Sequence, residues 1–366
     1  MIARSRSKPH TSGASSDYRR HWQGRLADYV TALAWSPNGA YLAVSASSGQ
    51  VMLWSEGEPR WLRPETAQSA IDCLAFSGDG RYLAAAGQQG TVFVWQMDRS
   101  GGPIAQLAPP QCWPHCWIDR LVWHPSQPLL AFGTGTQVRF WGQGILPAPL
   151  DFVDSSVLSL AWHPQGHHLA VGGHTGVKVW RSDDWESPPE FIEVPGASLS
   201  VAWSGDGRYL ASGNLDRTLT VVDWGKPPPW LMQGFPGKVR QVTWVSTGVS
   251  TGVSTGSAPQ VAAACLEGVT VWRRQGQSWE SRVLTAHADT VVAIATHPTR
   301  PLLASAAKDG QLCLWKNATT RQQTIRGKAE FSTLAWHPQG AYLAAGDSQG
   351  CLTLWKVAQR GRGFQR

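Results

Sequence analysis

Cys112, His115 and Cys116 are the residues of this chain best suited to bind a metal ion, because thiolate and imidazole are the usual ligands of zinc. They lie close together in the segment Gln-Cys-Trp-Pro-His-Cys-Trp. Adjacent residues seldom point at one ion, however, and the segment lacks a fourth ligand. We therefore expect a loop in which His115 makes a local hydrogen bond, with no bound metal or other cofactor. A metal site at these three residues is the alternative.

Two Gly-x-Ser-x-Gly matches, at 248–252 and 252–256, are the candidates for a serine nucleophile. This motif works only on a sharp turn between a strand and a helix, beside an oxyanion hole. Both matches lie in a tandem Ser-Thr-Gly-Val tract that no helical pattern follows, so chance in a repetitive tract explains them. We assign no catalytic residues and expect that the chain is not an enzyme.

Four histidines hold the same place in a recurring turn, each directly before a proline. The equivalent positions of three other repeats hold serine, at Ser36, Ser77 and Ser204. A position that accepts serine and is spread over different repeats is expected to be structural rather than part of a ring of metal ligands. The four residues are His124, His163, His297 and His337.

The elements that would position these residues come from a repeated pattern. An apolar residue, a small residue and an aromatic residue are followed by a Pro or Gly turn, Leu-Ala, Gly, and an alternating run that ends in tryptophan. The pattern occurs eight times, and its closing positions are 39 to 48 residues apart, the period of a four-stranded propeller blade. The closing residues are Trp54, Trp95, Trp141, Trp180, Trp224, Trp272, Trp315 and Trp355.

Each unit is built from short β-branched and aromatic segments bounded by turn residues, as at 29–35, 41–45 and 50–54. A fourth, more polar segment follows the closing tryptophan. The eighth unit has no such segment, whereas residues 20–26 precede the first unit and can supply it. Pairing of residues 20–26 with the eighth unit would leave no unpaired sheet edge where the ring closes. We predict an all-β fold, a closed β-propeller of four-stranded antiparallel blades.

Over residues 18–357 the chain resembles the WD-repeat family. In that family a blade is often locked by a histidine before the first strand, a serine or threonine in the second, an aspartate in the next turn and the closing tryptophan. The resemblance gives these roles in the seventh unit to His287, Ser305, Asp309 and Trp315. Seven blades is the commoner number in the family. All eight units retain their turn and closing run, so we expect eight blades, with seven as the alternative.

The formal charge of +7 lies at the ends of the chain. Residues 1–20 and 356–366 each sum to +4, which leaves 7 − 8 = −1 for the part between them. That part has no charge pattern for nucleic-acid binding, so only the tails could bind nucleic acid or an acidic membrane surface. We expect a basic disordered tail at 1–17, the propeller at 18–357 with a flexible insert at 246–259, and a basic tail at 358–366.

No apolar stretch approaches the length of a transmembrane segment, and the N-terminal residues lack the apolar core of a secretory signal. The six scattered cysteines are interpreted as reduced thiols. We therefore expect a soluble, cytoplasmic protein.

One position of the repeat varies strongly, three residues after the place of His287, and WD-repeat proteins often use this rim position to contact partners. It holds Thr290 in unit seven, and Tyr29, Trp117, Lys238 and Glu330 in others. The variation favours an interface, the alternative being that the aromatic residues only cover blade edges. The preferred partner-binding residues are Tyr29, Trp113, Trp117, Lys238, Arg240 and Lys308.

These observations predict a non-catalytic WD-repeat scaffold or adaptor that mediates protein–protein interactions in the assembly of a multiprotein complex. Its partners are expected to be one or more proteins, with no small-molecule substrate. The two alternatives are a metal-binding or enzymatic propeller that uses Cys112, His115 and Cys116, and a protein whose tails bind nucleic acid or an acidic membrane surface.

Overall fold

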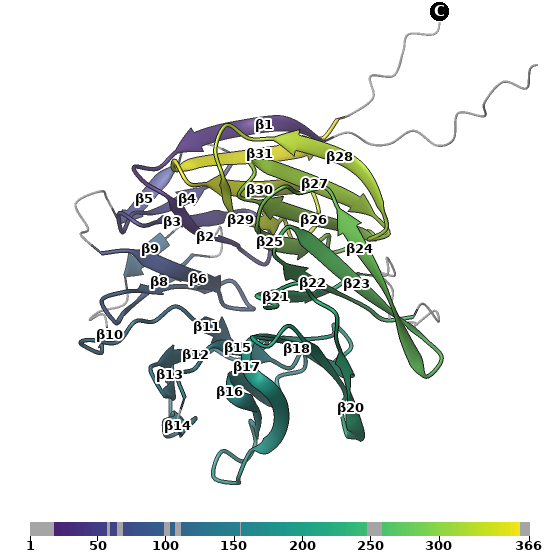
Figure 1. Cartoon of the computed structure of the whole chain (residues 1–366). Helices are drawn as coiled ribbons and strands as arrows, with labels where there is room; N and C mark the ends of the chain where they lie inside the picture. Colours follow the sequence, from purple (N-terminus) through teal and green to yellow (C-terminus); the bar gives the residue numbers. More distant parts are fainter. Residues whose placement is uncertain are drawn as a thin grey trace, which may run out of the picture.

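The structure is a computed structural model, in which residues 18–56, 59–63, 69–98, 103–106, 111–153, 155–246 and 258–358 are described. These residues form an all-β fold of antiparallel sheets arranged in a ring, as predicted (Figure 1). The predicted tails at 1–17 and 358–366, apart from residue 358, and most of the predicted insert at 246–259 lie outside the described residues. The predicted domain boundaries and the flexibility of these segments stay predictions.

The strands follow the repeat units along the chain. Units one to three contain β2 (Val30–Trp35), β3 (Leu42–Ala46), β4 (Val51–Trp54), β5 (Arg60–Arg63), β6 (Ile71–Phe76), β7 (Tyr82–Gly87), β8 (Thr91–Met97), β9 (Pro103–Gln106), β10 (Gln111–Cys112), β11 (Leu121–Trp123), β12 (Leu129–Thr134), β13 (Gln137–Gly142) and β14 (Leu150–Asp151). Units four and five contain β15 (Ser159–Trp162), β16 (His168–Arg181), β17 (Glu190–Trp203), β18 (Tyr209–Asn214), β19 (Leu219–Asp223) and β20 (Lys226–Met232). Units six to eight contain β21 (Gln241–Trp244), β22 (Gln260–Cys265), β23 (Gly268–Gln275), β24 (Ser278–Thr285), β25 (Val291–Thr296), β26 (Leu302–Ala307), β27 (Gln311–Lys316), β28 (Thr320–Arg326), β29 (Phe331–Trp336), β30 (Tyr342–Asp347) and β31 (Cys351–Val357).

The second strand of each unit is buried on both faces, because each sheet is packed between two others. In β7 the side chains of Leu83, Ala84, Ala85 and Ala86 are all fully buried, and β3, β26 and β30 repeat this run of small apolar residues. A strand buried on both faces is apolar without alternation. The repeated Leu-Ala of the sequence is therefore the centre of each sheet.

The described strands form seven hydrogen-bonded sheets, so the prediction of eight separate blades is not matched and the count agrees with the alternative of seven. Units four and five share one sheet in the order β15-β16-β17-β18-β19-β20. The connection between these units, 195–197, lies within strand β17 although Gly196 has a positive φ of 73°, and its last residue, Ala197, pairs with His174 of β16. Strand β17 therefore runs unbroken, with residues 190–193 paired to β16 and residues 198–203 paired to β18.

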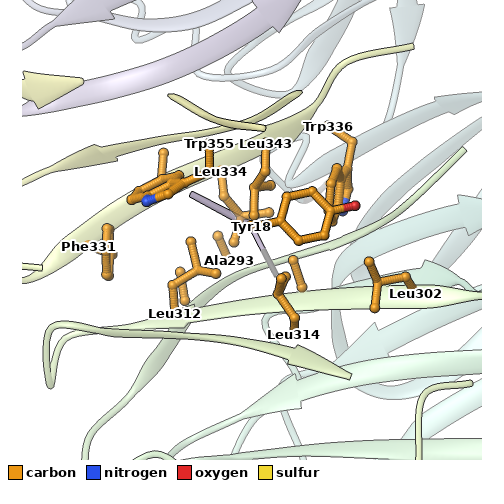
Figure 2. Packing of buried hydrophobic residues seen from close by; sticks show 13 residues of the cluster. Tyr18, Ala293, Leu302, Leu312, Leu314, Phe331, Leu334, Trp336, Leu343 and Trp355 are labelled. Carbon is orange, nitrogen blue, oxygen red and sulfur yellow. The ribbon is translucent and has the colours of Figure 1, made fainter. Parts of the chain in front are cut away.

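The ring is closed by a strand from the N-terminal side of the chain, as predicted. Strand β1 (Tyr18–Arg25) pairs antiparallel with β31, from Tyr18 opposite Val357 to Arg25 opposite Cys351, so it is the outer strand of unit eight. Tyr18 is buried beside Trp336 and Trp355 in a hydrophobic cluster between units seven and eight (Figure 2). Innermost strands also contact their neighbours from β2 around to β29 and back to β2.

Candidate partner-binding face

The rim residues Tyr29, Thr290 and Glu330 occupy equivalent places on one face of the ring, which we call the rim face, because the same backbone hydrogen bond holds each of them. The carbonyl of the rim residue accepts the N–H of a residue in the turn between the second and third strands. Ser47 donates to Tyr29 at 2.9 Å, and Lys308 donates to Thr290 at 3.0 Å. The same bond joins Ser348 to Glu330 at 2.8 Å. Lys308, predicted as a charged neighbour, therefore lies directly beside the rim position of its own unit.

Trp117 of unit three is the most exposed of the three predicted aromatic anchors. Its side chain is 58% exposed, yet the indole N–H donates to the Asp72 carboxylate of unit two at 2.7 Å. Burial raises the pKa of Asp72, the bond from Trp117 lowers it, and the nearby Asp119 raises it further. The hydrogen bond fixes the orientation of the ring before any partner arrives, which lowers the entropy cost of binding.

Tyr29 is the second exposed aromatic residue, on unit one. Its ring is 38% exposed, and its backbone N–H is held by the carboxylate of Asp28 at 2.7 Å. Partial burial raises the pKa of the phenol, the nearby Ser332 hydroxyl of unit eight lowers it, and the charge of Glu330 raises it. Tyr29 thus lies across the boundary between units one and eight.

Trp113, the third predicted anchor, is placed differently. Its half-buried ring packs on Phe132 of unit three with centroids 5.0 Å apart, and the guanidinium of Arg139 lies 5.9 Å from its centre. The segment around it folds over the turn at Gly90, whose carbonyl accepts the Trp113 N–H at 2.8 Å. Trp113 therefore fills the junction of units two and three, and its ring is not presented on the face.

The residues predicted as the alternative metal site do not converge. The described residues contain no group of three His, Cys, Asp or Glu side chains suited to a metal ion. The exposed Cys112 thiol lies 3.5 Å from the Thr91 hydroxyl, and His115 holds a tight turn with a φ of 64°. None of the six cysteines forms a disulfide, and Cys265 and Cys313 are buried.

The predicted cations Lys238, Arg240 and Lys308 are exposed on units six and seven, and none of them forms an ion pair with the residues that the structure describes. They lie on repeat units well separated along the ring from Trp117 of unit three. The face thus carries an exposed aromatic region over units one and three and a basic region over units six and seven. Separate aromatic and charged groups are a feature by which interfaces anchor and orient a partner.

The histidines before proline join neighbouring units, a role that the sequence did not reveal. In unit three the Nδ1 of His124 accepts backbone N–H groups at 3.2 and 3.0 Å, so the proton lies on Nε2, which donates to the Gly166 carbonyl of unit four at 3.1 Å. Its ring meets Trp162 edge to face at 4.7 Å. A Cβ on Gly166 would lie 2.3 Å from His124 Nε2, so this turn needs glycine. His163 and His337 make the same bonds to Gly207 and Gly39.

The four residues assigned by resemblance in unit seven are in contact. His287 Nε2 and Trp315 Nε1 lie 2.8 and 2.9 Å from the Ser305 hydroxyl. The Asp309 carboxylate lies 3.5 Å from His287 Nδ1 and accepts the Ala288 N–H at 2.8 Å. Burial lowers the pKa of His287, against the opposite effect of Asp309. The arrangement ties the entry of the first strand to the second and third strands.

Unit five, where Val222 takes the place of tryptophan, has a different buried network. The Ser212 hydroxyl donates its proton to the Asn214 amide oxygen at 2.7 Å, so it accepts the hydrogen bond from Ser198 at 2.7 Å. Asn214 then donates to Thr218 at 2.9 Å and Thr220 at 3.0 Å. A run of small polar residues on two buried strands is the signal that could have revealed this network.

A second feature missed in the sequence is an ion cluster around Asp223, which is 4% exposed. Arg208 binds it with two nitrogens, each 3.1 Å from a carboxylate oxygen, and these bonds hold the pKa of Asp223 below its usual value. Arg274 of unit six approaches to 3.5 Å. The cluster therefore ties unit five to unit six.

The closed ring of antiparallel sheets, with its repeated turns and interunit contacts, defines a β-propeller. Residues 17–55, 63–96, 149–181 and 195–223 match the family described as WD domain, G-beta repeat, and residues 236–366 match the family described as IFT140 first beta-propeller. As predicted, the chain is similar to WD-repeat β-propellers in its repeat matches and in its fold. It matches none of the curated proteins with which it was compared. No helix in the described part of the chain is long and apolar enough to cross a membrane.

Proposed function

We propose that this protein is a non-catalytic scaffold that assembles other proteins and binds a protein partner on its rim face. The observation that carries the proposal is Trp117, whose ring is 58% exposed and yet fixed by a hydrogen bond to Asp72. An exposed tryptophan held in one orientation is typical of an interface hot spot.

The family matches support the same general role, since propellers of this kind typically bind other proteins. The fold alone does not assign a function, so the argument depends on the face itself. Tyr29 offers a second exposed ring, and Lys238, Arg240 and Lys308 offer cations without ion pairs among the described residues. Complex assembly and a cytoplasmic location stay predictions.

Affinity purification of the tagged full chain, followed by mass spectrometry, tests the proposal. The variant Trp117→Ala is expected to lose a specific partner that the wild type retains, because truncation of a hot-spot tryptophan costs about 2 kcal/mol or more, roughly a 30-fold loss of affinity. The matched control is Trp61→Ala, which removes a similarly exposed tryptophan (43%) from the outer strand β5. Retention of every partner by Trp117→Ala would contradict the proposal.

A further inference from the structure

A groove lies between β1 and β28, the outer strands of units eight and seven, and we call it the closure groove. Its volume is about 760 Å³. Gln323 of β28 joins the two strands: its side-chain oxygen accepts the Tyr18 N–H at 2.8 Å, and its amide donates to the Tyr18 carbonyl at 2.9 Å. Figure 1 shows β1 and β28 beside each other where the chain closes. The groove forms only because β1 completes unit eight.

The floor of the closure groove is apolar. Phe331 and Trp355 line it together with Ile325 and Ala345. The two aromatic rings are only 5% and 6% exposed, and they meet with centroids 6.4 Å apart (Figure 2). The groove therefore offers edges of packed rings and aliphatic carbon, without an open aromatic face.

The walls of the closure groove are basic. Arg20 and Arg25 of β1 stand on one side, and Arg326 and Lys328 at the end of β28 stand on the other, all four exposed. Arg25, Arg326 and Lys328 form no ion pair with the residues that the structure describes. Their charges are therefore available to a ligand.

The one acid among the lining residues, Asp347, is already bonded within its own turn. Its Oδ1 accepts the backbone N–H groups of Gln349 at 2.9 Å and Cys351 at 2.8 Å, and the residue is 8% exposed. Four cations against one committed carboxylate give the groove a net positive field. Three of these four cations belong to residues 21–355, whose charges sum to −1, so the local positive charge is not visible in the sequence.

We propose that the closure groove binds an extended acidic segment of another protein, with apolar side chains between its carboxylates. Carboxylates would pair with the cations of both walls, and alternate side chains of an extended chain would reach the apolar floor. Outer strands at sheet edges suit such a ligand, because their free backbone groups can pair with an extended chain. This surface is separate from the rim face and goes beyond the function proposed above.

Two other occupants fit the groove less well. Single-stranded nucleic acid binds by stacking its bases on exposed aromatic faces. The rings of Phe331 and Trp355 are buried and offer the groove only their edges. The tails of this chain are themselves basic: residues 1–17 hold Arg4, Arg6 and Lys8 against Asp17, and the residues after 358 hold Arg360, Arg362 and Arg366. Like charge disfavours them in a basic groove.

Fluorescence polarisation with the full chain tests the proposal, using a labelled peptide in which Asp and Glu alternate with Leu. Arg326→Ser/Lys328→Ser is expected to weaken binding about tenfold, and Arg20→Ser/Arg25→Ser to weaken it similarly from the opposite wall. The matched control Arg273→Ser/Arg282→Ser removes two exposed cations from β23 and β24 of unit six and should change the affinity by less than about twofold. Both groove variants alter only exposed side chains, so their thermal midpoints should match that of the wild type.

Several results would overturn the proposal. Wild-type affinity in both groove variants would place the site elsewhere, including on the tails. Equal binding of a peptide with Asn and Gln in place of the acids would remove the role of charge. If a single-stranded oligonucleotide binds more tightly than the acidic peptide, and the groove variants lose this binding, the ligand is a nucleic acid. Self-association of the wild type by light scattering, lost in the groove variants, would identify a second copy as the occupant.

Discussion

Acidification is expected to weaken the fold through His297, which lies at the junction of units seven and eight. The residue is 1% exposed, its Nδ1 accepts the N–H groups of Thr299 and Arg300 at 3.2 and 3.1 Å, and its ring packs on Trp336 at 4.8 Å. Burial, with help from the Arg300 charge, lowers the pKa of His297 from 6.5 to about 4. His297 therefore binds a proton less readily in the folded protein than in the unfolded chain.

The sign of the effect follows from the lowered pKa. Between pH 6.5 and about 4 the unfolded chain binds the His297 proton and the folded protein does not, so the free energy of unfolding falls as the pH falls through this window. At 1.36 kcal/mol per pH unit, His297 alone removes about 2 kcal/mol by pH 5 and about 3 kcal/mol by pH 4. Above pH 6.5 its contribution is constant.

Urea unfolding of the wild type and His297→Ser, followed by tryptophan fluorescence at pH 7.5 and pH 5, measures this contribution. Serine holds the equivalent position at Ser77, so the turn can accept it. At pH 7.5 the variant should be less stable by about 1–2 kcal/mol because the ring contact is lost. At pH 5 this difference should shrink by about 2 kcal/mol, since serine does not titrate in this range.

The other buried histidines before proline are present in both the wild type and His297→Ser, so their effect on stability cancels in the comparison and only that of His297 remains. Ser77→Ala is the control, and its difference from the wild type should be the same at both pH values. If the difference between the wild type and His297→Ser does not change between pH 7.5 and pH 5, the reasoning from burial is refuted.

Two further predictions concern the locks of the ring. Ser305→Ala leaves the buried Nε2 of His287 and the buried indole N–H of Trp315 without the hydroxyl that both contact, and it should lower the free energy of unfolding by about 2 kcal/mol; an unchanged urea midpoint would contradict a locking role. Tyr18→Ala removes a buried ring from the closing strand β1 and should cost about 3 kcal/mol and increase proteolysis of that strand. Wild-type stability and protease resistance in this variant would show that the closure does not support the fold.

Local features of the fold were predictable because the sequence repeats them. The Pro or Gly turn, the Leu-Ala of the second strand and the closing tryptophan specify hairpins within one unit. The closing segment expected at 20–26 corresponds to β1 at Tyr18–Arg25. It could be predicted because the sequence of unit eight has no outer strand of its own. The seam between units four and five was not predictable, since Pro195 and Gly196 resemble a break but strand β17 continues through both, with a positive φ at Gly196.

The candidate sites depend on neighbours distant in sequence. Trp113 and Trp117 are four residues apart and look alike as anchors. Only the fold of the segment over Gly90 buries one ring against Phe132 and leaves the other exposed beside Asp72. The closure groove is lined by Arg25 and Lys328, which lie near opposite ends of the sequence.

The sequence by itself determined the repeat, the strands and the closing segment, because hydrophobic period and turn chemistry act over a few residues. Only the tertiary structure decided which histidine reaches which turn, which tryptophan is exposed and where the cations gather. The physical reason is that these properties arise between units packed face to face, at contacts set by the ring as a whole.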